Sequence, residues 1–305
     1  MRSIEFYAGI GGLSAACPWL DVVAAFDIDR DAQSVFQCNF TTPYHVRELE
    51  SVPVEWIAEL AAELWWLSPP CTPFTRRGHQ RDIEDPRTRS FQRLMQLAAI
   101  VRPKTLVIEN VVGFESSAMF AACVQLWEQH GYRVSSLALC PSQLGWPNTR
   151  PRIYTLATLD SQSLDAWVDS QTRVSNPNTW LHRTCPTLAR CLQPEIQRDT
   201  HPWLWLDPVV AERYASALDV VDPEQPDAIA ACFASSYGKA VVRSGSVIRC
   251  QGGLRRFAPR EVANLLGFPE SFTWPDHLSP RRLWHLLGNS LAIPAVAHCM
   301  QFSHR

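Results

Sequence analysis

Short apolar runs alternate with amphipathic stretches over the first half of the chain. The apolar runs have the length and residue types of buried strands. Their predicted bounds are Ser3–Ala8, Asp21–Phe26, Glu63–Leu67, Thr105–Ile108, Arg133–Leu139 and Arg152–Ala157. Helical periodicity lies between them, at Asp29–Phe40, Val54–Ala62, Thr88–Val101 and Ser116–His130. This alternation predicts a parallel sheet covered by helices on both faces.

The pattern changes after about residue 160. The segment Ser161–Arg198 is polar, interrupted by prolines and rich in tryptophan, and it has no clear period. Helical signals return from Phe257 onward, at Pro259–Leu266, Pro280–Leu287 and Ile293–Phe302. We therefore predict an α/β domain over residues 1–160 that is completed by 256–305, with an irregular insert over 161–255.

The composition is that of a globular protein. A chain of 305 residues with 46% apolar side chains can bury a large core in one or two domains. No apolar run reaches the ~18 residues of a membrane span. The sequence opens with Met1-Arg2-Ser3 and passes directly into the first strand, without the pattern of a signal peptide. We expect a soluble, cytoplasmic protein without a membrane partner.

The formal net charge of −2 does not by itself indicate a nucleic-acid-binding protein. The basic residues are nevertheless all arginines except Lys104 and Lys239, and many gather in two parts of the sequence. These are Arg76, Arg77, Arg81, Arg87, Arg89 and Arg93, and then Arg243, Arg249, Arg255, Arg256 and Arg260. Such clusters form either a phosphate-binding surface or ordinary solvated faces, and charge alone does not separate the two.

Ten cysteines are spread along the chain without a Cys-x-x-Cys pair. Zinc sites often take their ligands from such pairs, so we expect no metal. We expect the thiols to be reduced, and most of them to be small core residues.

A glycine turn and a carboxylate follow the first two predicted strands, at the sheet edge where such folds bind ligands. The turn is Gly9-Ile10-Gly11-Gly12, and a helix-like stretch follows it to about Pro18. Asp27 ends the second strand, where a carboxylate can hold ribose hydroxyls. Ser14 stands where the pattern G-x-G-x-x-G has its last glycine, so a plain turn is equally compatible.

The segment LSPPCTPFT, Leu67 to Thr75, holds Cys71 between prolines. Proline fixes φ and restricts the residue before it, so this cysteine has little backbone freedom. A nucleophile that must meet a reacting atom needs such restraint. A buried thiol in a proline turn has the same sequence.

Two further strand ends carry charged side chains. Glu109 and Asn110, in VIENV, are compatible with a cap or with a carboxyl group that donates or accepts a proton. Arg150 and Arg152, in NTRPRIY, alternate with Pro151. If the chain is extended, both side chains point to the same side. They would then either face a ligand or be surface charges on an edge strand.

Taken together and in this order, these motifs resemble those of the cytosine-5 methyltransferases. The family motifs F-x-G-x-G-G, P-C-Q, E-N-V, paired arginines and G-N-S have counterparts along nearly the whole chain. The counterparts are Phe6–Gly12, Pro70-Cys71-Thr72, Glu109-Asn110-Val111, Arg150-Pro151-Arg152 and Gly288-Asn289-Ser290. Thr72 departs from the family, which usually has glutamine there.

The resemblance implies the α/β, Rossmann-like fold of methyltransferases that use S-adenosylmethionine as the cofactor. Residues 1–160 and 256–305 would form the catalytic domain, and 161–255 a small irregular target-recognition insert. The implied cofactor-binding residues are Tyr7, Gly9, Ile10, Gly11, Gly12, Asp27, Ile28, Glu50, Pro70, Asn289 and Ser290.

The resemblance also implies a mechanism in which the Cys71 thiolate adds to C6 of cytosine. Glu109 would contact N3 and N4 and supply a proton at N3, with Asn110 beside it. Arg152 would contact O2, and Arg150 would support Arg152. C5 then takes the methyl group, a base removes the C5 proton, and elimination frees Cys71. The target base must leave its stack to react.

Within the family, the chain is most similar to the branch of DNA methyltransferase homologue two, which methylates aspartate tRNA. The similar segments are Ser68–Arg76, Asn148-Thr149-Arg150, CFASSYG from Cys232, LLGFPESF and LLGNSL. The similarity implies a cytosine in the anticodon loop of aspartate tRNA as the substrate of a monomeric enzyme. Arg76, Arg77 and Arg81, which follow the nucleophile, would contact phosphates.

Three other functions fit parts of the pattern. A DNA cytosine-5 methyltransferase has the same motifs. A catalytically silent nucleic-acid-binding relative would not need the complete set of Cys71, Glu109 and Arg152. A nicotinamide-dependent oxidoreductase fits the glycine turn alone.

Overall fold

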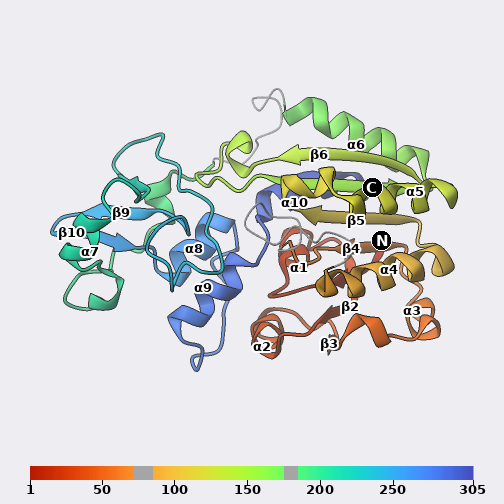
Figure 1. Ribbon diagram of the computed structural model, residues 1–305, viewed down its shortest axis with the longest axis horizontal. Coiled ribbons are helices and arrows are strands. Elements are labelled where there is room, and N and C mark those ends of the chain that lie inside the picture. The colour runs from red at the N-terminus through yellow and green to blue at the C-terminus, as the bar shows by residue number, and fades with distance from the viewer. Residues whose placement is uncertain (72–84, 175–184, 305) are drawn as a thin grey trace. The chain divides into compact units, whose positions relative to one another are not determined.

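The structure is a computed structural model that describes residues 1–71, 85–174 and 185–304, without the side chains of 170–174 and 304. The chain forms two compact units (Figure 1). The first unit consists of residues 1–139, 151–176 and 296–305. The second consists of residues 140–150 and 177–295.

The first unit is built on a seven-stranded sheet with the order β3-β2-β1-β4-β5-β7-β6. Its strands are β1 (Arg2–Phe6), β2 (Asp21–Asp27), β3 (Tyr44–Val46), β4 (Leu64–Leu67), β5 (Thr105–Asn110), β6 (Arg133–Leu139) and β7 (Arg152–Thr158). Every residue of β4 and β5 is buried, as expected for central strands with both faces covered.

Helices cover this sheet (Figure 1). They are α1 (Gly12–Ala16), α2 (Arg30–Asn39), α3 (Val54–Glu59), α4 (Arg89–Val101), α5 (Ala118–Gln129) and α6 (Ser161–Val174). Local sequence sets several of their starts. The Asp29 carboxylate accepts hydrogen bonds from the first turn of α2, and the Ser117 hydroxyl does the same for α5. The core between helices and sheet includes the rings of Phe6, Phe26 and Trp65.

The predicted α/β class is confirmed, and three details differ from the sequence analysis. Strand β7 runs antiparallel to both β5 and β6, so the sheet is mixed rather than wholly parallel. Alternation of strands and helices does not report the direction of a strand that follows another strand without a helix between them. Strand β3 and helix α6 were not predicted. Helix α6 has few apolar residues, and its buried Trp167 packs against Phe302.

The second unit has a three-stranded sheet and short helices. The strands are β8 (Val220–Val221), β9 (Val247–Cys250) and β10 (Gly253–Arg256), and the helices are α7 (Pro208–Arg213), α8 (Pro259–Leu266) and α9 (Pro280–Gly288). Helix α10 (Ile293–Cys299) begins in this unit and ends in the first. A buried ion pair joins Arg255 of β10 to Glu261 of α8, with Nη1 and Oε2 2.7 Å apart.

The compact units do not coincide with the predicted domains. Residues 256–295 group with the second unit, because α8 and α9 pack on each other and α8 packs on the 3-10 helix η8 (Leu188–Cys191). The backbone N–H of Gln193 also donates to the buried Glu261 carboxylate at 3.0 Å. The functional division into catalytic and recognition parts stays a prediction. In the described part of the chain, no helix is long and apolar enough to cross a membrane.

Candidate active site

Three hydrogen bonds fix the start of the Pro-Cys loop. The Ser68 N–H donates to the Phe6 carbonyl at 3.4 Å, and its hydroxyl donates to the Tyr7 carbonyl at 3.2 Å. On the other side, Asn110 Nδ2 donates to the Pro69 carbonyl at 3.1 Å. The sheet order explains this arrangement, because β4 lies between β1 and β5. Asn110, predicted as a catalytic residue, therefore positions the backbone that leads into Cys71.

Cys71 is partly buried and lies within electrostatic reach of Arg87. Arg87 Nε and Nη2 bond the two oxygens of the buried Asp85 at 2.8 and 2.6 Å. The pKa of Arg87 is raised, first by its hydrogen bond to Asp85 and to a smaller extent by the charges of Asp85 and Cys71. A fixed cation favours the thiolate form of a nearby cysteine. The sequence analysis placed Arg87 only in an arginine cluster, since nothing local links it to the thiol.

Glu109 and Arg152 form an ion pair at the end of β5, with Nε and Oε1 3.0 Å apart. Glu109 lies opposite Tyr154 in the β5–β7 register, so Arg152 is its diagonal neighbour on the same face. Glu109 is 6% exposed, which leaves its carboxyl group little contact with water. The structure thus brings together two of the predicted catalytic residues through β7, a strand that was predicted but whose antiparallel direction was not.

Arg150 has different partners from Arg152. It is 3% exposed, and its guanidinium donates to the carbonyls of Phe233 at 3.1 Å, Gly288 at 3.0 Å and Ser290. These acceptors all belong to the second unit, whereas Arg152 belongs to the first. Arg150 therefore ties together the backbone of its own unit, a role that the predicted support of Arg152 did not include.

The backbone of the glycine turn has positive φ angles, which favour glycine. Gly9 and Gly11 have φ of 52° and 89°, and a Cβ on Gly11 would lie 2.9 Å from the Phe36 ring. Asp27 holds the turn against β2, because one carboxylate oxygen accepts from the Gly9 N–H at 2.8 Å. The other oxygen accepts from Ile28 at 2.7 Å and Asp29 at 3.1 Å. Burial raises the pKa of Asp27 in spite of these donors.

The surroundings of this turn fit an adenosine group. Ile28 is 68% exposed beside the Asp27 carboxylate, and a Cβ on Gly9 would meet nothing within 4 Å. Burial raises the pKa of Tyr7 against the hydrogen bond from its hydroxyl to Ser90, and the charges of Glu50 and Asp27 raise it further. An exposed apolar side chain, open backbone and two carboxylates are the partners that an adenine ring and ribose hydroxyls need.

The family of the chain follows from a match along nearly its full length. A family model described as C-5 cytosine-specific DNA methylase matches residues 1–301. The chain belongs to this family. The predicted enzyme class, a cytosine-5 methyltransferase, is thereby confirmed.

Known proteins of this methyltransferase family resemble the chain over almost all of both lengths. A "tRNA (cytosine(38)-C(5))-methyltransferase" of Schizosaccharomyces pombe is 30% identical and covers 98% of this chain and 95% of its own. A protein of the same name from Bos taurus is 29% identical, with 97% of each chain covered. The crystal structure of the S. pombe Dnmt2 methyltransferase matches with a TM-score of 0.82 and 28% identity, and covers 98% and 96% of the two chains.

The other predicted site residues of this methyltransferase lie in several places. Pro70 is exposed beside Cys71, Ile10 and Gly12 are buried in the glycine turn, and Glu50 is exposed on the 3-10 helix η1 (Leu49–Ser51). Asn289 and Ser290 belong to the second unit, where Asn289 Nδ2 lies 3.3 Å from His285 Nε2. Thr72, Arg76, Arg77 and Arg81 lie outside the described residues. The described ranges contain no group of three or more histidine, cysteine, aspartate or glutamate residues that could hold a metal ion.

Proposed function

We propose that this enzyme methylates C5 of a cytosine in the anticodon loop of aspartate tRNA, through a covalent bond between Cys71 and C6. The substrate assignment rests on one observation: along nearly the whole of each chain, the protein is similar to relatives named for cytosine 38 of tRNA. The chemistry is supported by Cys71 at a fixed loop and by the paired Glu109 and Arg152. Bases of a tRNA loop are partly unstacked, so flipping one costs less than in a duplex.

The first step joins the Cys71 sulfur to C6 of the target cytosine. The Cys71 thiolate supplies the electron pair. The pair displaced from the C5–C6 double bond moves into the ring toward N3 and O2, and C5 becomes nucleophilic. Glu109 accepts a hydrogen bond from the N4 amino group and holds a proton at N3, while Arg152 donates to O2 as negative charge develops.

The cofactor side of the reaction falls to the glycine turn. Gly9 to Gly12, with Asp27, Ile28 and Glu50, would hold S-adenosylmethionine, which supplies an electrophilic methyl group for C5. A base then removes the C5 proton. The electron pair of that bond re-forms the C5–C6 double bond, the bond from sulfur to C6 breaks, and Cys71 leaves as the thiolate.

DNA is the alternative substrate, since the matching family model is described as a DNA methylase. Transfer of tritiated methyl groups to aspartate tRNA and to duplex DNA, measured side by side, separates the two. We expect labelled tRNA. Label in DNA but not in tRNA would assign the enzyme to the alternative substrate.

A trapped adduct tests the covalent step. With 5-fluorocytosine at the target position, the fluorine cannot leave as a proton does, so the bond between sulfur and C6 persists. We expect an RNA–protein band on a denaturing gel that requires S-adenosylmethionine and is absent in Cys71→Ser. Cys38→Ser, which changes an exposed thiol of the same unit, is the control and should keep the band. A band in Cys71→Ser would contradict this nucleophile.

A further inference from the structure

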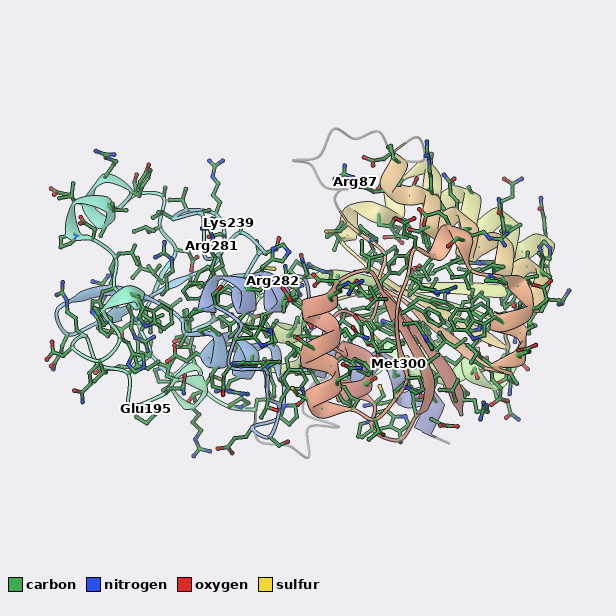
Figure 2. The ribbon with its side chains drawn as sticks, turned by 90° about the horizontal axis from the view of Figure 1, so that it is seen from below. Arg87, Glu195, Lys239, Arg281, Arg282 and Met300 are labelled. Atoms are coloured by element: carbon green, nitrogen blue, oxygen red, sulfur yellow. The ribbon has the colours of Figure 1, made fainter. Side chains whose placement is uncertain are left out.

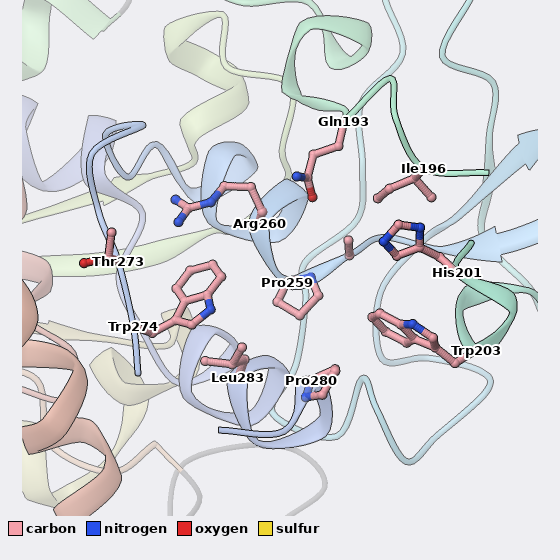
Figure 3. Close-up of a pocket in the computed structure, with 11 residues that line it drawn as sticks. Gln193, Ile196, His201, Trp203, Pro259, Arg260, Thr273, Trp274, Pro280 and Leu283 are labelled. Carbon is pink, nitrogen blue, oxygen red and sulfur yellow. The ribbon is translucent and has the colours of Figure 1, made fainter. Parts of the chain in front are cut away.

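The second unit contains a pocket that the mechanism above does not use (Figure 3). Its volume of about 420 Å³ lies within the range of small-ligand sites, roughly 300–1,000 Å³. Its walls come from the polar segment before β8, the start of α8, the loop before α9 and α9 itself. The side chains that matter below are Gln193, His201, Trp203, Arg260, Trp274 and Pro280.

Two tryptophans give this pocket aromatic walls. Figure 3 shows Trp203 and Trp274 on opposite sides of Pro259 and Pro280. Trp203 is 45% exposed, an unusual state for so large an apolar side chain, and the ring of His201 lies 6.4 Å from it. Flat aromatic faces that remain open to solvent are the surfaces on which unpaired nucleobases stack.

Arg260 adds a positive charge to the same wall. Its guanidinium carbon lies 4.3 Å from the centre of the Trp274 ring. One terminal nitrogen donates to the Phe272 carbonyl, while Nη1 has no acceptor among the described residues. The described carboxylates likewise form no salt bridge with it. Arg260 therefore adds positive charge on the Trp274 side of the pocket (Figure 3).

Two exposed cations lie next to the pocket. Arg281 follows the lining residue Pro280, and a Cβ on Gly238 would lie 3.2 Å from Arg281 Cγ, so Lys239 is its neighbour. Figure 2 shows Lys239 and Arg281 in the same part of the molecule. The ring of Trp284, which a Cβ on Gly238 would also meet, lies 5.7 Å from that of Trp203. If a base of a single-stranded nucleic acid entered the pocket, these two cations would therefore lie close to its phosphates.

We propose that this pocket binds one unpaired nucleobase of the RNA substrate, separate from the target cytosine, and that Lys239 and Arg281 bind the adjoining phosphates. The proposal rests on RNA as the substrate. Aromatic grooves also bind proline-rich peptides, but such peptides do not account for the two cations beside this one. The base would stack on the exposed ring of Trp203, and Arg260 would add positive charge on the Trp274 side of the pocket.

Stacking is tested with Trp203→Ala and a matched control, Ile229→Ala, which changes a 46% exposed apolar side chain elsewhere in the same unit. The probes are an unstructured oligoadenylate of about ten nucleotides and an aspartate tRNA transcript. We expect Trp203→Ala to weaken binding of both about tenfold and to raise KM for tRNA similarly, with kcat unchanged. The control should bind as the wild type does.

The phosphate contacts are tested by salt dependence. A single-stranded phosphate contact contributes about 0.7 to the slope of log K against log salt, so Lys239→Gln/Arg281→Gln should lower the slope by about 1.4. Trp203→Ala should keep the wild-type slope, because stacking releases no counterions. Arg213→Gln, an exposed arginine of α7, is the charge control and should leave the slope unchanged.

The outcomes separate this proposal from the proposed function. If the wild type methylates tRNA but Trp203→Ala binds both probes normally, the pocket assignment is wrong and the function stands. If the wild type methylates only DNA, yet binds oligoadenylate through Trp203, the pocket stands and the substrate does not. Competition by a proline-rich peptide, with no effect of Trp203→Ala on either RNA, would make the pocket a peptide site.

Discussion

Two arginines that stand two residues apart in the sequence belong to different units of the molecule and contact different kinds of group. Arg152 pairs with a carboxylate at the end of the first unit's sheet, and its side chain is 14% exposed. Arg150 is buried among backbone carbonyls of the second unit. We expect a substrate to compete for the side-chain partner of Arg152, whereas the backbone partners of Arg150 are part of the fold.

The contrast extends to the segments around them. In the first unit, Cys71 follows the end of β4, and Glu109 pairs with Arg152 at the end of β5. In the second, Arg150 and the glycine of the G-N-S motif are close-packed, since a Cβ on Gly288 would lie 2.6 Å from the Ala234 carbonyl oxygen. We therefore expect this family signature to combine reacting groups with groups that hold the chain, and mutations should separate the two.

The largest effect is expected for Arg152→Met. Loss of a donor aimed at developing charge costs on the order of 10²–10³ in rate, about 3–4 kcal/mol. Glu109 is nearly buried but can take up a proton when this partner is lost, so stability should fall by less than the roughly 3 kcal/mol typical of a broken buried pair. Methyl transfer and urea unfolding measure the two effects. A variant that unfolds easily but keeps its kcat would place Arg152 with Arg150.

Arg150→Met should show the reverse pattern. Three carbonyls would lose their donor in a buried site, at roughly 1 kcal/mol each, so we expect unfolding to become easier by about 3 kcal/mol. The activity of the protein that remains folded should stay within a fewfold of the wild type. An unchanged urea midpoint together with lost activity would make Arg150 a participant in the reaction.

A third prediction concerns pH and the buried Glu5 of β1. Desolvation raises the pKa of Glu5 from 4.5 to about 7, against hydrogen bonds from Ser14 and Leu13. The native state therefore binds the proton more tightly than the unfolded chain does. Its contribution to stability is complete below pH 4.5 and is lost as pH rises through 7, by at most roughly 3 kcal/mol at about 1.4 kcal/mol per pKa unit.

The free energy of unfolding of Glu5→Gln should not show this decrease as pH rises. We expect the variant to gain stability relative to the wild type between pH 5 and pH 8, as measured by urea unfolding at both values. Parallel pH profiles for the two proteins would show that Glu5 titrates alike in the native and unfolded states.

The smallest effect is expected at Asp27. Its carboxylate already accepts three backbone N–H groups, so Asp27→Ala should loosen the glycine turn as well as remove the ribose partner. We expect S-adenosylmethionine to bind at least tenfold more weakly, about 1.4 kcal/mol, by titration calorimetry. Glu48→Ala, an exposed carboxylate near Glu50, is the control. Equal affinity in all three proteins would remove Asp27 from the cofactor site.

Much of the first unit could be predicted because its strands are short runs of apolar and β-branched residues, buried throughout in β4 and β5, and because helices such as α4 have an apolar stripe. Strand β6 was predicted with the observed bounds, and β2 to within one residue. Helix α6 was not predicted, since its sequence is mostly polar and Ser163 and Trp167 are the buried side chains among those described in it. Periodicity reports which face of a segment is buried, and it fails where little of the segment is buried.

The candidate site was predictable residue by residue but not in its connections. Motifs indicated Cys71, Glu109 and Arg152, whereas the contact between the last two depends on the direction of β7. The link from Asp85 through Arg87 to Cys71, and the different partners of Arg150, depend on tertiary packing. A sequence motif gives residue types at fixed spacing, and it does not show which residues from different motifs contact each other in the folded chain.

The discontinuous first unit has a consequence for synthesis on the ribosome. Residues 296–304 complete this unit, where Cys299 and Met300 are fully buried and Ser303 accepts a hydrogen bond from Trp19 Nε1 at 3.2 Å. These residues are translated only after the whole of 177–295, on the order of ten seconds later at ~5–20 residues per second. We expect the apolar surface that these residues bury to stay open to water during that interval, where a chaperone can bind it until synthesis is complete.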